Sequence, residues 1–456
     1  MLNKEASLAF KAISGIEKFY TDPGDCYVYG YDNSRRQVLP DAVIFPQTHQ
    51  HVVTICEICN QYKIPLTVRG RGTATTGATV PVEAGLVVSM EQMNKVISFQ
   101  PENRLIIVEP GITNQEVQEH VKAKGFFWAP DPSSSAFCSV GGNIACNAAG
   151  PRAVKYGTTR DHILGLTSVT GDAKTLVCGV KTTKGVVGYD FTRLITGSEG
   201  TLAIITQATL KLLPLPETKQ TIQVIFDSIA SATRAITALM SQPIIPCALE
   251  FIDKNAINMI RDYSSAYLPE QAQALLMIEI DGSKDCIDQQ ALCIEKTVKQ
   301  SGCLEYKVAQ TKEEINELWK TRKALSPALR KIAPKKINED IVVPVANIPT
   351  LLEQIEQLAH KYDIAIVNFG HAGNGNIHVN LLTNPDDPEK LTQAYQCLED
   401  LFKLVLKLDG TLSGEHGIGL EKKDYIHWEL GETNLQLMKS IKQQFDPNNI
   451  LNPGKI

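Results

Sequence analysis

The sequence predicts an α+β fold with at least two domains. Its 456 residues exceed what one hydrophobic core usually organises. Up to about Pro216 the chain is rich in glycine and in short strand patterns, and beyond it strand patterns alternate with longer helical ones. We therefore expect domains at 1–215 and 216–425, followed by a C-terminal helix and tail at 426–456 that return to the first domain.

Short apolar runs bounded by turn residues predict the strands. In the first domain they are Leu66–Arg69, Leu86–Met90, Arg104–Val108, Leu164–Thr170 and Leu202–Leu213. In the second domain they are Thr221–Phe226, Ala248–Phe251, Ala274–Ile280, Asn338–Val343 and Ala365–Phe369. Helical periodicity predicts helices at Gln50–Tyr62, Asn114–Lys124 and Asn434–Phe445. The prolines of Leu213–Glu217 oppose both a strand ladder and a helix, so this stretch is predicted to be a linker.

Charge and cysteine usage exclude several classes of protein. The 45 basic and 50 acidic residues give a net charge of −5 without a basic cluster, so nucleic acid is not an expected partner. The 11 cysteines lack paired spacing, which indicates a reducing compartment. Cys56 and Cys59 form a lone CxxC inside a helical pattern, which favours a buried helix face over a redox motif. No ferredoxin-type cysteine run is present, so an iron–sulfur cluster would belong to a partner.

The sequence carries no sign of export or of membrane insertion. Lys4, Glu5 and Lys11 interrupt the apolar stretch at the start, unlike the core of a signal peptide. No apolar run reaches the length of a membrane span. We therefore expect a soluble, cytoplasmic protein.

The glycine-rich stretch Arg69–Gly77 predicts an anion-binding loop. It follows a short strand, and its backbone amides can form a concavity for a pyrophosphate. A nicotinamide-binding turn is the main competitor, and Glu91 lies at about the twenty-residue spacing that such a turn requires. That turn must open a helix, however, and the β-branched, glycine-interrupted stretch Thr73–Pro81 disfavours one. We therefore reject the nicotinamide interpretation.

Three more stretches of the first domain follow the same pattern. Pro130–Ser135 and Gly141–Gly150 combine small residues with exposed amides, and Gly197–Leu202 is another turn of this kind. Each one alone is equally well explained as a turn or as a tightly packed helix of small residues. Together with the Arg69–Gly77 loop, they favour a long ligand that touches several loops.

The segment His371–His378 predicts a hairpin that can bind a metal. Apolar runs flank Asn374–Gly375, the strongest short-range hairpin signal, because both residues tolerate positive φ. His371 and His378 lie symmetrically about that pair, so in a regular hairpin they face each other with Cβ atoms about 5 Å apart. Asn380 shares the face of His378, because side chains alternate along a strand.

Glu415, within Gly414–Gly417, completes a three-ligand set with the two imidazoles. Such a set leaves coordination positions open, as catalytic metal sites do, and it suits zinc first and manganese second. Glu415 and His416 are adjacent and point in different directions in an extended segment, so one can bind the ion while the other handles a proton. A His-x6-His pair also occurs by chance, and most histidines are solvated or satisfied in a core. The convergence of several candidates in glycine-rich turns favours the metal.

These segments resemble the FAD-linked oxidases of the vanillyl-alcohol-oxidase type, in the branch of D-lactate dehydrogenase, the glycolate oxidase catalytic subunit and D-2-hydroxyglutarate dehydrogenase. The resemblance covers nearly the whole chain and includes Phe445–Gly454 as the usual C-terminus. It implies a PCMH-type FAD-binding domain of two subdomains and a C-terminal substrate or cap domain in which helices cover an antiparallel sheet. FAD would be held noncovalently, because the Arg69–Gly77 loop offers no histidine for attachment. The residues implied to bind FAD are Arg69, Gly70, Arg71, Gly72, Thr73, Thr76, Gly77, Pro130, Asp131, Ser133, Gly141, Gly142, Asn143, Asn147, Gly150, Tyr156, Gly157, Glu199, Gly200, Ile204 and Asn452.

The resemblance also implies roles in the second domain. His371, His378 and Glu415 would hold the metal, and His416 would act as the base. Arg322, shortly after a tryptophan, resembles the arginine that clamps a substrate carboxylate. The alternative is that this arginine is a solvated charge on a helix face, the commoner fate of such residues.

Two further assignments rest on the same resemblance. A lysine is expected before the strand that begins near Asn338, and Lys335 and Lys336 compete for the position, with Lys336 preferred. Asn380 is the fourth candidate catalytic residue. Arg71 stands where the family often has glycine, so it either meets the pyrophosphate charge or points to solvent.

The activity implied is oxidation of a small D-2-hydroxy acid, with D-lactate or glycolate as the first candidates, to the 2-oxo acid. Arg322 and the metal would hold the carboxylate, His416 would remove the hydroxyl proton, and hydride would pass to flavin N5. Because the chain has no second redox motif, electrons would pass to an external quinone, cytochrome or iron–sulfur partner subunit, which could also hold the protein at the inner membrane. The alternatives are a metal-independent oxidase that uses dioxygen and a noncatalytic flavin-binding subunit; a homodimer is left open.

Overall fold

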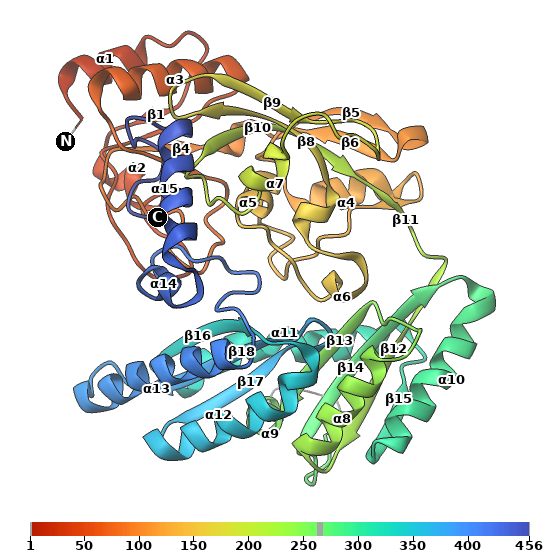
Figure 1. The fold of residues 1–456 in the computed structure, drawn as a ribbon. Coiled ribbons are helices and arrows are strands. Elements are labelled where there is room, and N and C mark those ends of the chain that lie inside the picture. Colours follow the sequence, from red (N-terminus) through yellow and green to blue (C-terminus); the bar gives the residue numbers. More distant parts are fainter. Residues whose placement is uncertain (1, 262–267, 456) are drawn as a thin grey trace. The chain divides into compact units, whose positions relative to one another are not determined.

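The computed structural model describes residues 2–261 and 268–455, except the side chains of residues 326, 327 and 330–332. The chain divides into two compact units (Figure 1). The first, which we call the loop unit, comprises Met1–Ala149, Gly157–Leu215 and Glu415–Ile456, and the second, the sheet unit, comprises Gly150–Tyr156 and Pro216–Gly414. The chain passes from the loop unit to the sheet unit after Leu215 and returns after Gly414. The second boundary expected from the sequence was after residue 425.

The loop unit contains two larger sheets and a short two-stranded ladder. The first has the strand order β1-β2-β4-β3, and β2 and β3 both run parallel to β4. Its strands are β1 (Phe19–Tyr20), β2 (Ala42–Ile44), β3 (Leu66–Arg69) and β4 (Leu86–Ser89). Helices α1 (Lys4–Lys11) and α3 (His49–Tyr62) pack against this sheet. Cys56 and Cys59 lie on the buried face of α3, which confirms the interpretation of the CxxC as a helix face.

The second sheet of the loop unit has the order β5-β6-β10-β8-β9 and is antiparallel. Its strands are β5 (Val96–Gln100), β6 (Leu105–Val108), β8 (Ile163–Thr170), β9 (Thr175–Gly179) and β10 (Ala203–Lys211). Helices α4 (Asn114–Lys122) and α5 (Val140–Ala145) bury apolar side chains against it. Helix α4 begins where the sequence favours it, because Thr113 and Glu116 form a reciprocal capping box.

One expectation about the linker was wrong. Strand β11 (Leu213–Pro214) pairs antiparallel with β7 (Phe126–Phe127), so the proline-containing stretch takes part in a short ladder. Proline is tolerated at such an edge position. The other short elements of the loop unit are α2 (Pro23–Tyr27), η1 (Met90–Gln92), η2 (Pro101–Asn103), η3 (Thr159–His162), α7 (Phe191–Ile195), η6 (Lys423–Tyr425), α14 (Ile426–Glu429) and α15 (Glu432–Phe445).

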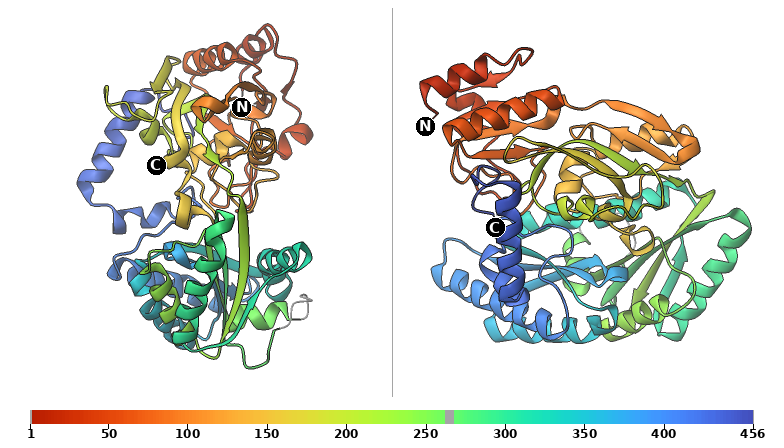
Figure 2. Two further views of the ribbon diagram at one scale, coloured as in Figure 1. Left: turned by 90° about the vertical axis from the view of Figure 1, so that its right-hand side faces the viewer. Right: turned by 45° about the horizontal axis from the view of Figure 1, so that its top comes forward.

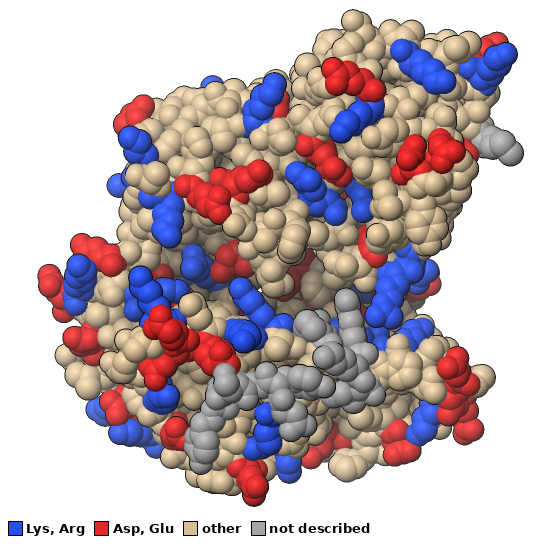
Figure 3. All heavy atoms as spheres, turned by 180° about the vertical axis from the view of Figure 1, so that it is seen from behind, with Lys and Arg blue, Asp and Glu red and all other residues tan. Residues whose placement is uncertain are grey.

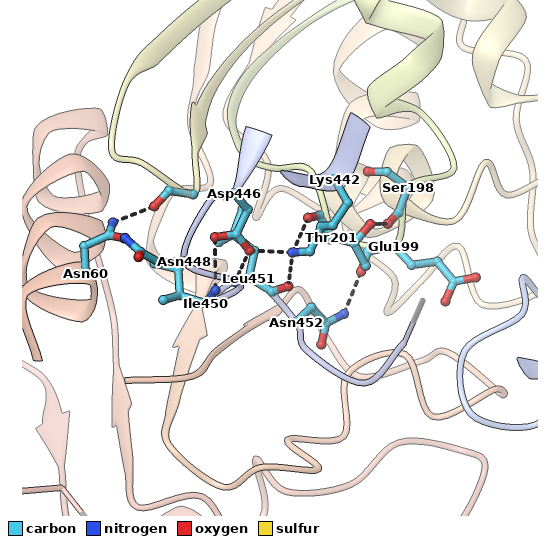
Figure 4. Close-up of polar contacts among 11 residues, drawn as sticks. Asn60, Ser198, Glu199, Thr201, Lys442, Asp446, Asn448, Ile450, Leu451 and Asn452 are labelled. Carbon is cyan, nitrogen blue, oxygen red and sulfur yellow. Dashed lines mark hydrogen bonds and ion pairs between the residues drawn. The ribbon is translucent and has the colours of Figure 1, made fainter. Parts of the chain in front are cut away.

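The C-terminal tail extends the edge of the first sheet. Leu66 N–H donates to the carbonyl oxygen of Ile450 at 2.7 Å, and Asn452 N–H donates to that of Leu66 at 2.6 Å. Figure 4 shows the Asp446 carboxylate, which accepts the N–H groups of Ile450 at 3.0 Å and Leu451 at 2.7 Å. The tail is therefore a fixed part of the loop unit.

The sheet unit is built on a sheet with the order β15-β12-β14-β13-β17-β18-β16, in which neighbouring strands are antiparallel. Its strands are β12 (Thr218–Phe226), β13 (Ala248–Asp253), β14 (Ala274–Gly282), β15 (Cys303–Val308), β16 (Lys335–Val342), β17 (Ala365–His371) and β18 (Asn376–Thr383). Its helices are α6 (Ala153–Tyr156), α8 (Ile229–Met240), α9 (Lys254–Ile260), α10 (Lys284–Gln300), η4 (Val345–Asn347), α11 (Lys312–Ile332), α12 (Ile348–Tyr362), η5 (Ala372–Asn374) and α13 (Pro388–Lys407). Antiparallel strands covered by helices confirm the fold expected for the second domain.

The two faces of this sheet differ. Helices α8, α10, α12 and α13 form a layer along one face, as the views in Figures 1 and 2 show. On the other face, α9 and α11 pack on Ile252, Val367 and Phe369. By strand alternation this second face also carries the candidate side chains of β17 and β18, so the site has helices α9 and α11 as neighbours.

The distribution of charged side chains on the surface agrees with the nearly equal numbers of basic and acidic residues. On the face drawn in Figure 3, basic and acidic side chains are interspersed and do not gather into fields of one sign. Within the described residues, none of the helices has the length and apolar character that crossing a membrane requires.

Candidate active site

Strands β17 and β18 form the expected hairpin, but with a different register. His371 pairs with Asn376 and Phe369 pairs with His378, so the two histidines are not directly opposite each other. The loop contains a turn of 3-10 helix, and Gly375, at φ 76°, closes it in the left-handed conformation. The predicted symmetric facing of His371 and His378 was therefore wrong, because the loop is longer than a two-residue turn.

The shift leaves both imidazoles on one face. It amounts to an even number of residues, and side chains alternate along a strand, so His378 becomes the diagonal neighbour of His371. Their ring centroids lie 5.2 Å apart with an interplanar angle of 85°. Both side chains are buried. The pair can therefore still point nitrogen atoms at a common position.

Glu415 supplies the third candidate ligand. Its carboxylate and one nitrogen from each imidazole lie within 4.8 Å of one another. Glu415 directly follows Gly414, the last residue of the sheet unit, whose N–H donates to the Asp340 carboxylate at 2.9 Å. Two imidazoles and a carboxylate form the donor set that a catalytic zinc or a similar divalent ion accepts, so the residues fit such an ion.

Glu250 is a residue of this site that the sequence analysis missed. It is fully buried on β13, where it pairs with His371 of β17. Its two oxygens lie 2.5 Å from His371 Nδ1 and 2.7 Å from Arg322 Nε. Burial alone would raise the pKa of Glu250, but His371 and Arg322 together hold it below its ordinary value.

The Glu250 bond orients His371. An ionised carboxylate only accepts hydrogen bonds, so Nδ1 must carry the proton in this contact. The lone pair of a neutral His371 then lies on Nε2, the atom left for a metal. A carboxylate behind a ligating imidazole is the usual way to fix its tautomer and ring orientation. The only sequence signal for Glu250 was an acidic residue inside a run predicted to be a buried strand.

Arg322 of α11 is placed beside the same carboxylate. Its guanidinium carbon lies 4.9 Å from the ring centroid of Phe369, and its Nε donates to Glu250. Trp319, on the preceding turn of α11, donates from Nε1 to Glu279 at 3.2 Å. Both side chains therefore fix α11 to the sheet. The Nε contact does not use the two terminal guanidinium nitrogens, which form the pair that recognises a carboxylate.

The structure separates the two competing lysines. Lys335 Nζ lies 3.2 Å from the Tyr395 hydroxyl of α13, on the face that α8, α10, α12 and α13 cover. Lys336 alternates with it and pairs with Leu382, so it lies on the face of His378. Asn380 shares that face; it is fully buried, its Nδ2 donates to two backbone carbonyls, and its Oδ1 has no hydrogen-bond partner among the described residues.

The glycine-rich stretches of the loop unit converge. A Cβ atom on Gly70 would lie 2.2 Å from Ser139 Oγ, which caps α5, so the loop after β3 touches the start of that helix. Gly197 N–H donates to Ile144 O at 2.9 Å, and Glu199 N–H donates to Ala145 O at 2.8 Å, at the other end of α5. Two of the stretches therefore touch opposite ends of one short helix, α5, which lies largely in the third stretch, Gly141–Gly150.

Several candidate side chains in these stretches bond to the protein itself. Arg69 Nη1 donates to Tyr31 O at 2.6 Å, so its guanidinium holds the preceding segment. Asn143 Oδ1 accepts from Asn114 Nδ2 at 3.2 Å. Asn147 Oδ1 accepts from Arg160 N at 2.9 Å. These contacts shape the loops.

Other candidates are placed as follows. No helix follows β3 within Gly70–Val80, which agrees with the rejection of a nicotinamide-binding turn. Pro130 O accepts from Asn114, Gly200 approaches Val68 and Asn452, and Ile204 is buried in the core. Gly141 and Gly142 lie in α5, and the remaining candidates stand in the loop segments themselves: Gly72, Thr73, Gly77, Asp131, Ser133 and Gly157.

Gly150–Tyr156 is grouped with a different unit from the other glycine-rich stretches. It belongs to the sheet unit, where the Tyr156 hydroxyl donates to Asp281 Oδ2 at 2.8 Å. Burial, with the nearby Asp281, raises the pKa of Tyr156. Gly150 and Tyr156 thus belong to the sheet unit, and their contact with FAD stays a prediction.

The converging loops leave buried polar atoms without partners. Among the described residues, Arg71 Nε, Thr75 Oγ1 and Asn452 Oδ1 are buried and make no hydrogen bond. The side-chain amide of Asn452 ties two of the loops together, because its Nδ2 donates to Ala78 O at 2.9 Å and to Glu199 O at 2.6 Å. Unsatisfied buried donors and acceptors beside glycine-rich backbone fit a polar ligand such as FAD.

Comparison with known proteins identifies two matching domains. The FAD binding domain matches residues 40–179, and the C-terminal domain of FAD linked oxidases matches residues 215–456. The glycolate oxidase subunit GlcD of Bacillus subtilis (strain 168) is 38% identical over 457 residues, covering 100% of this chain and 97% of the relative. A D-lactate dehydrogenase of Archaeoglobus fulgidus is 33% identical over 440 residues, covering 95% of this chain and 96% of the relative.

A solved structure supports the fold independently. p-Cresol methylhydroxylase with bound substrate superposes with a TM-score of 0.78 over 99% of this chain and 96% of the other, at 17% identity. That identity is too low to transfer function, but the common fold matches the arrangement implied by the sequence. The matched domains and the full-length relatives establish that this chain belongs to the FAD-linked oxidases and is an enzyme of that family.

Proposed function

We propose that this enzyme oxidises a small D-2-hydroxy acid to the 2-oxo acid, with noncovalent FAD and a divalent metal, zinc first. The relatives support the reaction class, because their names specify glycolate oxidase and D-lactate dehydrogenase. D-lactate and glycolate are accordingly the first candidate substrates. The observation that carries the proposal is the cluster of His371, His378 and Glu415, with Arg322 joined to the same site through Glu250.

The residues of the chain divide the work. When bound, FAD supplies the two-electron acceptor and the metal supplies the positive charge that makes an alcohol hydroxyl more acidic. The terminal nitrogens of Arg322 bind the substrate carboxylate bidentately, which fixes its orientation. Lys336 and Asn380 contribute a cation and a carbonyl acceptor on the same sheet face as His378. His416 takes the hydroxyl proton, a role suited to an imidazole near neutral pH.

The electron acceptor is proposed to be external. The sequence shows no ferredoxin-type cysteine run, and the relative from Bacillus subtilis is named as a subunit. We infer a quinone, a cytochrome or an iron–sulfur partner subunit as the acceptor. Steady-state assays with a dye acceptor and with dioxygen test this inference: rapid dye reduction without peroxide supports it, and stoichiometric peroxide in air contradicts it.

The proposed reaction is tested by anaerobic reduction of the bound flavin. D-lactate, glycolate and D-2-hydroxyglutarate are each mixed with the FAD-loaded protein, and the loss of the yellow absorbance is followed. We expect at least one of them to bleach the flavin, with L-lactate as the control for handedness. A flavin that no 2-hydroxy acid reduces would instead indicate a noncatalytic flavin-binding subunit.

The base is tested with His416→Ala. Removal of a general base typically costs about 10²-fold to 10⁴-fold in rate, so bleaching by the active substrate should slow by that factor while FAD stays bound. Metal content, measured by elemental analysis after dialysis, should be unchanged. Bleaching at the wild-type rate would exclude His416 as the base.

A further inference from the structure

The segment that carries Glu415 and His416 is held at both ends by carboxylates. On the sheet-unit side, Asp340 is fully buried on β16, and its Oδ2 accepts the N–H of Gly414 at 2.9 Å. Its carboxylate also accepts the Ser413 hydroxyl at 3.3 Å. The chain is therefore fixed immediately before Glu415.

On the loop-unit side the second carboxylate is that of Glu199. Its Oε1 accepts the N–H of Ile418 at 2.6 Å, and its Oε2 accepts the N–H of Gly419 at 2.9 Å. Both oxygens are thus engaged by consecutive backbone amides. In Figure 4 the carbonyl oxygen of Glu199 faces Asn452, and its carboxylate points away from the tail.

The glycines of this segment permit the contact. A Cβ atom on Gly417 would lie 2.4 Å from Glu199 Oε1, and its φ of 85° disfavours other residues. A Cβ atom on Gly419 would lie 2.3 Å from Thr76 O. Larger residues at either position would push the segment away from the groups that hold it.

Thr76 adds two contacts from the glycine-rich loop after β3. Its hydroxyl donates to the carbonyl oxygen of His416 at 3.3 Å, and its own carbonyl accepts Leu420 N–H at 2.7 Å. Glu199 stands in another glycine-rich stretch, which bonds to the end of α5. The main chain around His416 is therefore bonded directly to the two stretches that touch the ends of α5.

We propose that Glu199 is a positioning residue for His416, and that it acts through the backbone amides of Ile418 and Gly419. This role is added to the expected contact of Glu199 with FAD, which stays a prediction. The inference rests on the proposed function, in which His416 is the base. Because a displacement of about 1 Å can lower a rate by about 10²-fold, a loose segment would place the imidazole poorly even with every ligand bound.

The test is a double-mutant cycle with Glu199→Gln and His416→Ala. An amide in place of the carboxylate offers one acceptor and one donor, so one of the two backbone bonds is lost. The rate of anaerobic flavin reduction per bound flavin is measured with the 2-hydroxy acid that reduces the wild type. We expect Glu199→Gln to slow it by about 30-fold or more in the wild-type background and by less than about threefold in the His416→Ala background.

Asp446→Asn is the matched control. Asp446 also accepts two consecutive backbone N–H groups in the loop unit, from Ile450 and Leu451. Its substitution should lower the melting temperature and leave the rate per bound flavin unchanged. Gly417→Ala is the second variant, because it displaces the Glu199 carboxylate by a different route, and it should reproduce the kinetic effect of Glu199→Gln.

Each outcome decides the matter. An equal slowing in both backgrounds, an unchanged rate, or loss of flavin from Glu199→Gln in both backgrounds would overturn the positioning role. If Glu199→Gln does not fold, Gly417→Ala decides by the same criterion. Failure of the proposed function has a different signature, since His416→Ala alone would then reduce its flavin at the wild-type rate.

Discussion

The sheet unit and the loop unit hold their candidate residues by different means. In the sheet unit, Glu250, His371, His378 and Asn380 stand on neighbouring strands, and strand alternation places them on one face. In the loop unit, the glycine-rich stretches have no such regular frame. Hydrogen bonds between loops and to the ends of α5 fix them.

This difference determines which structural changes each unit tolerates without moving its candidate residues. A register change by an even number of residues keeps the side chains of His371 and His378 on the same face of the sheet. A change by one residue would place them on opposite faces. A loop has no equivalent periodicity, so the loss of one contact moves its neighbours. Variants in the sheet unit should therefore act through buried charge, and variants in the loop unit through close backbone packing.

The largest effect is expected for Glu250→Ala. It leaves Arg322 buried beside His371 without their common carboxylate, and such a loss typically costs about 3–5 kcal/mol of stability. Removing the partner behind a ligating imidazole also weakens metal binding by about tenfold to a hundredfold. Urea unfolding and zinc titration of the dialysed protein measure the two effects.

Glu279→Ala is the control for that variant. Glu279 is a buried carboxylate on the adjacent strand β14, and it accepts from Lys219, Thr221 and Trp319. Its loss should destabilise the fold and leave zinc affinity unchanged. Equal loss of zinc affinity in both variants would mean that Glu250 acts only on the fold.

The next effect tests the loop unit with Gly70→Ala. The added Cβ would lie 2.2 Å from Ser139 Oγ, and overpacking of this kind costs about 1–3 kcal/mol. We expect FAD affinity to fall by about tenfold to a hundredfold, measured by fluorescence titration of the FAD-free protein. Gly431→Ala, where nothing lies within 4 Å, should bind FAD as the wild type does. Unchanged affinity in Gly70→Ala would remove this loop from the FAD site.

What the sequence could predict follows the same division. Apolar runs located β3, β8, β14 and β17, because strand patterns depend on neighbouring residues. Alternation placed Asn380 on the face of His378. The hairpin register was not predictable, because a turn of 3-10 helix replaced the expected two-residue turn.

Contacts between distant segments were beyond the sequence. Glu250 meets His371 only because β13 lies next to β17, and no local pattern indicates that pairing. Glu199 was predicted to bind FAD from the family resemblance, and nothing in the local sequence indicated that its carboxylate also bonds to Ile418 and Gly419. Motifs thus indicated candidate segments, while the partners of individual side chains depended on the tertiary fold.

Lys335 and Lys336 lie on opposite faces of β16, and substituting each in turn tests the sheet unit with a smaller expected effect. Lys336→Met removes a cation from the face of His378, and the loss of one hydrogen bond to a charged group costs about 1.5 kcal/mol, or about tenfold in kcat/KM. Lys335→Met, on the face of Tyr395, should leave kcat/KM unchanged. The opposite result would assign the substrate contact to Lys335.

The last comparison is between two buried carboxylates of β13. Glu250 faces Arg322 and His371, and its pKa is lowered. Asp253 accepts neutral N–H groups from Asn255, Ala256 and Asn368, and burial raises its pKa to about 7. Between its ordinary value and about 7 the folded state therefore binds more protons than the unfolded state, so the free energy of unfolding falls as the pH rises. The slope from this one group is at most about 1.4 kcal/mol per pH unit.

Asp253→Asn should remove that slope, because an amide does not titrate. Urea unfolding of both proteins at several pH values between 4 and 7 measures it, and parallel curves would contradict the assignment. Asp400→Asn provides a contrast of opposite sign: hydrogen bonds from Lys361 and Tyr362 lower the pKa of Asp400, so its contribution is lost as the pH falls. The two variants together show whether the partners of a carboxylate, charged or neutral, set the direction of its pH dependence.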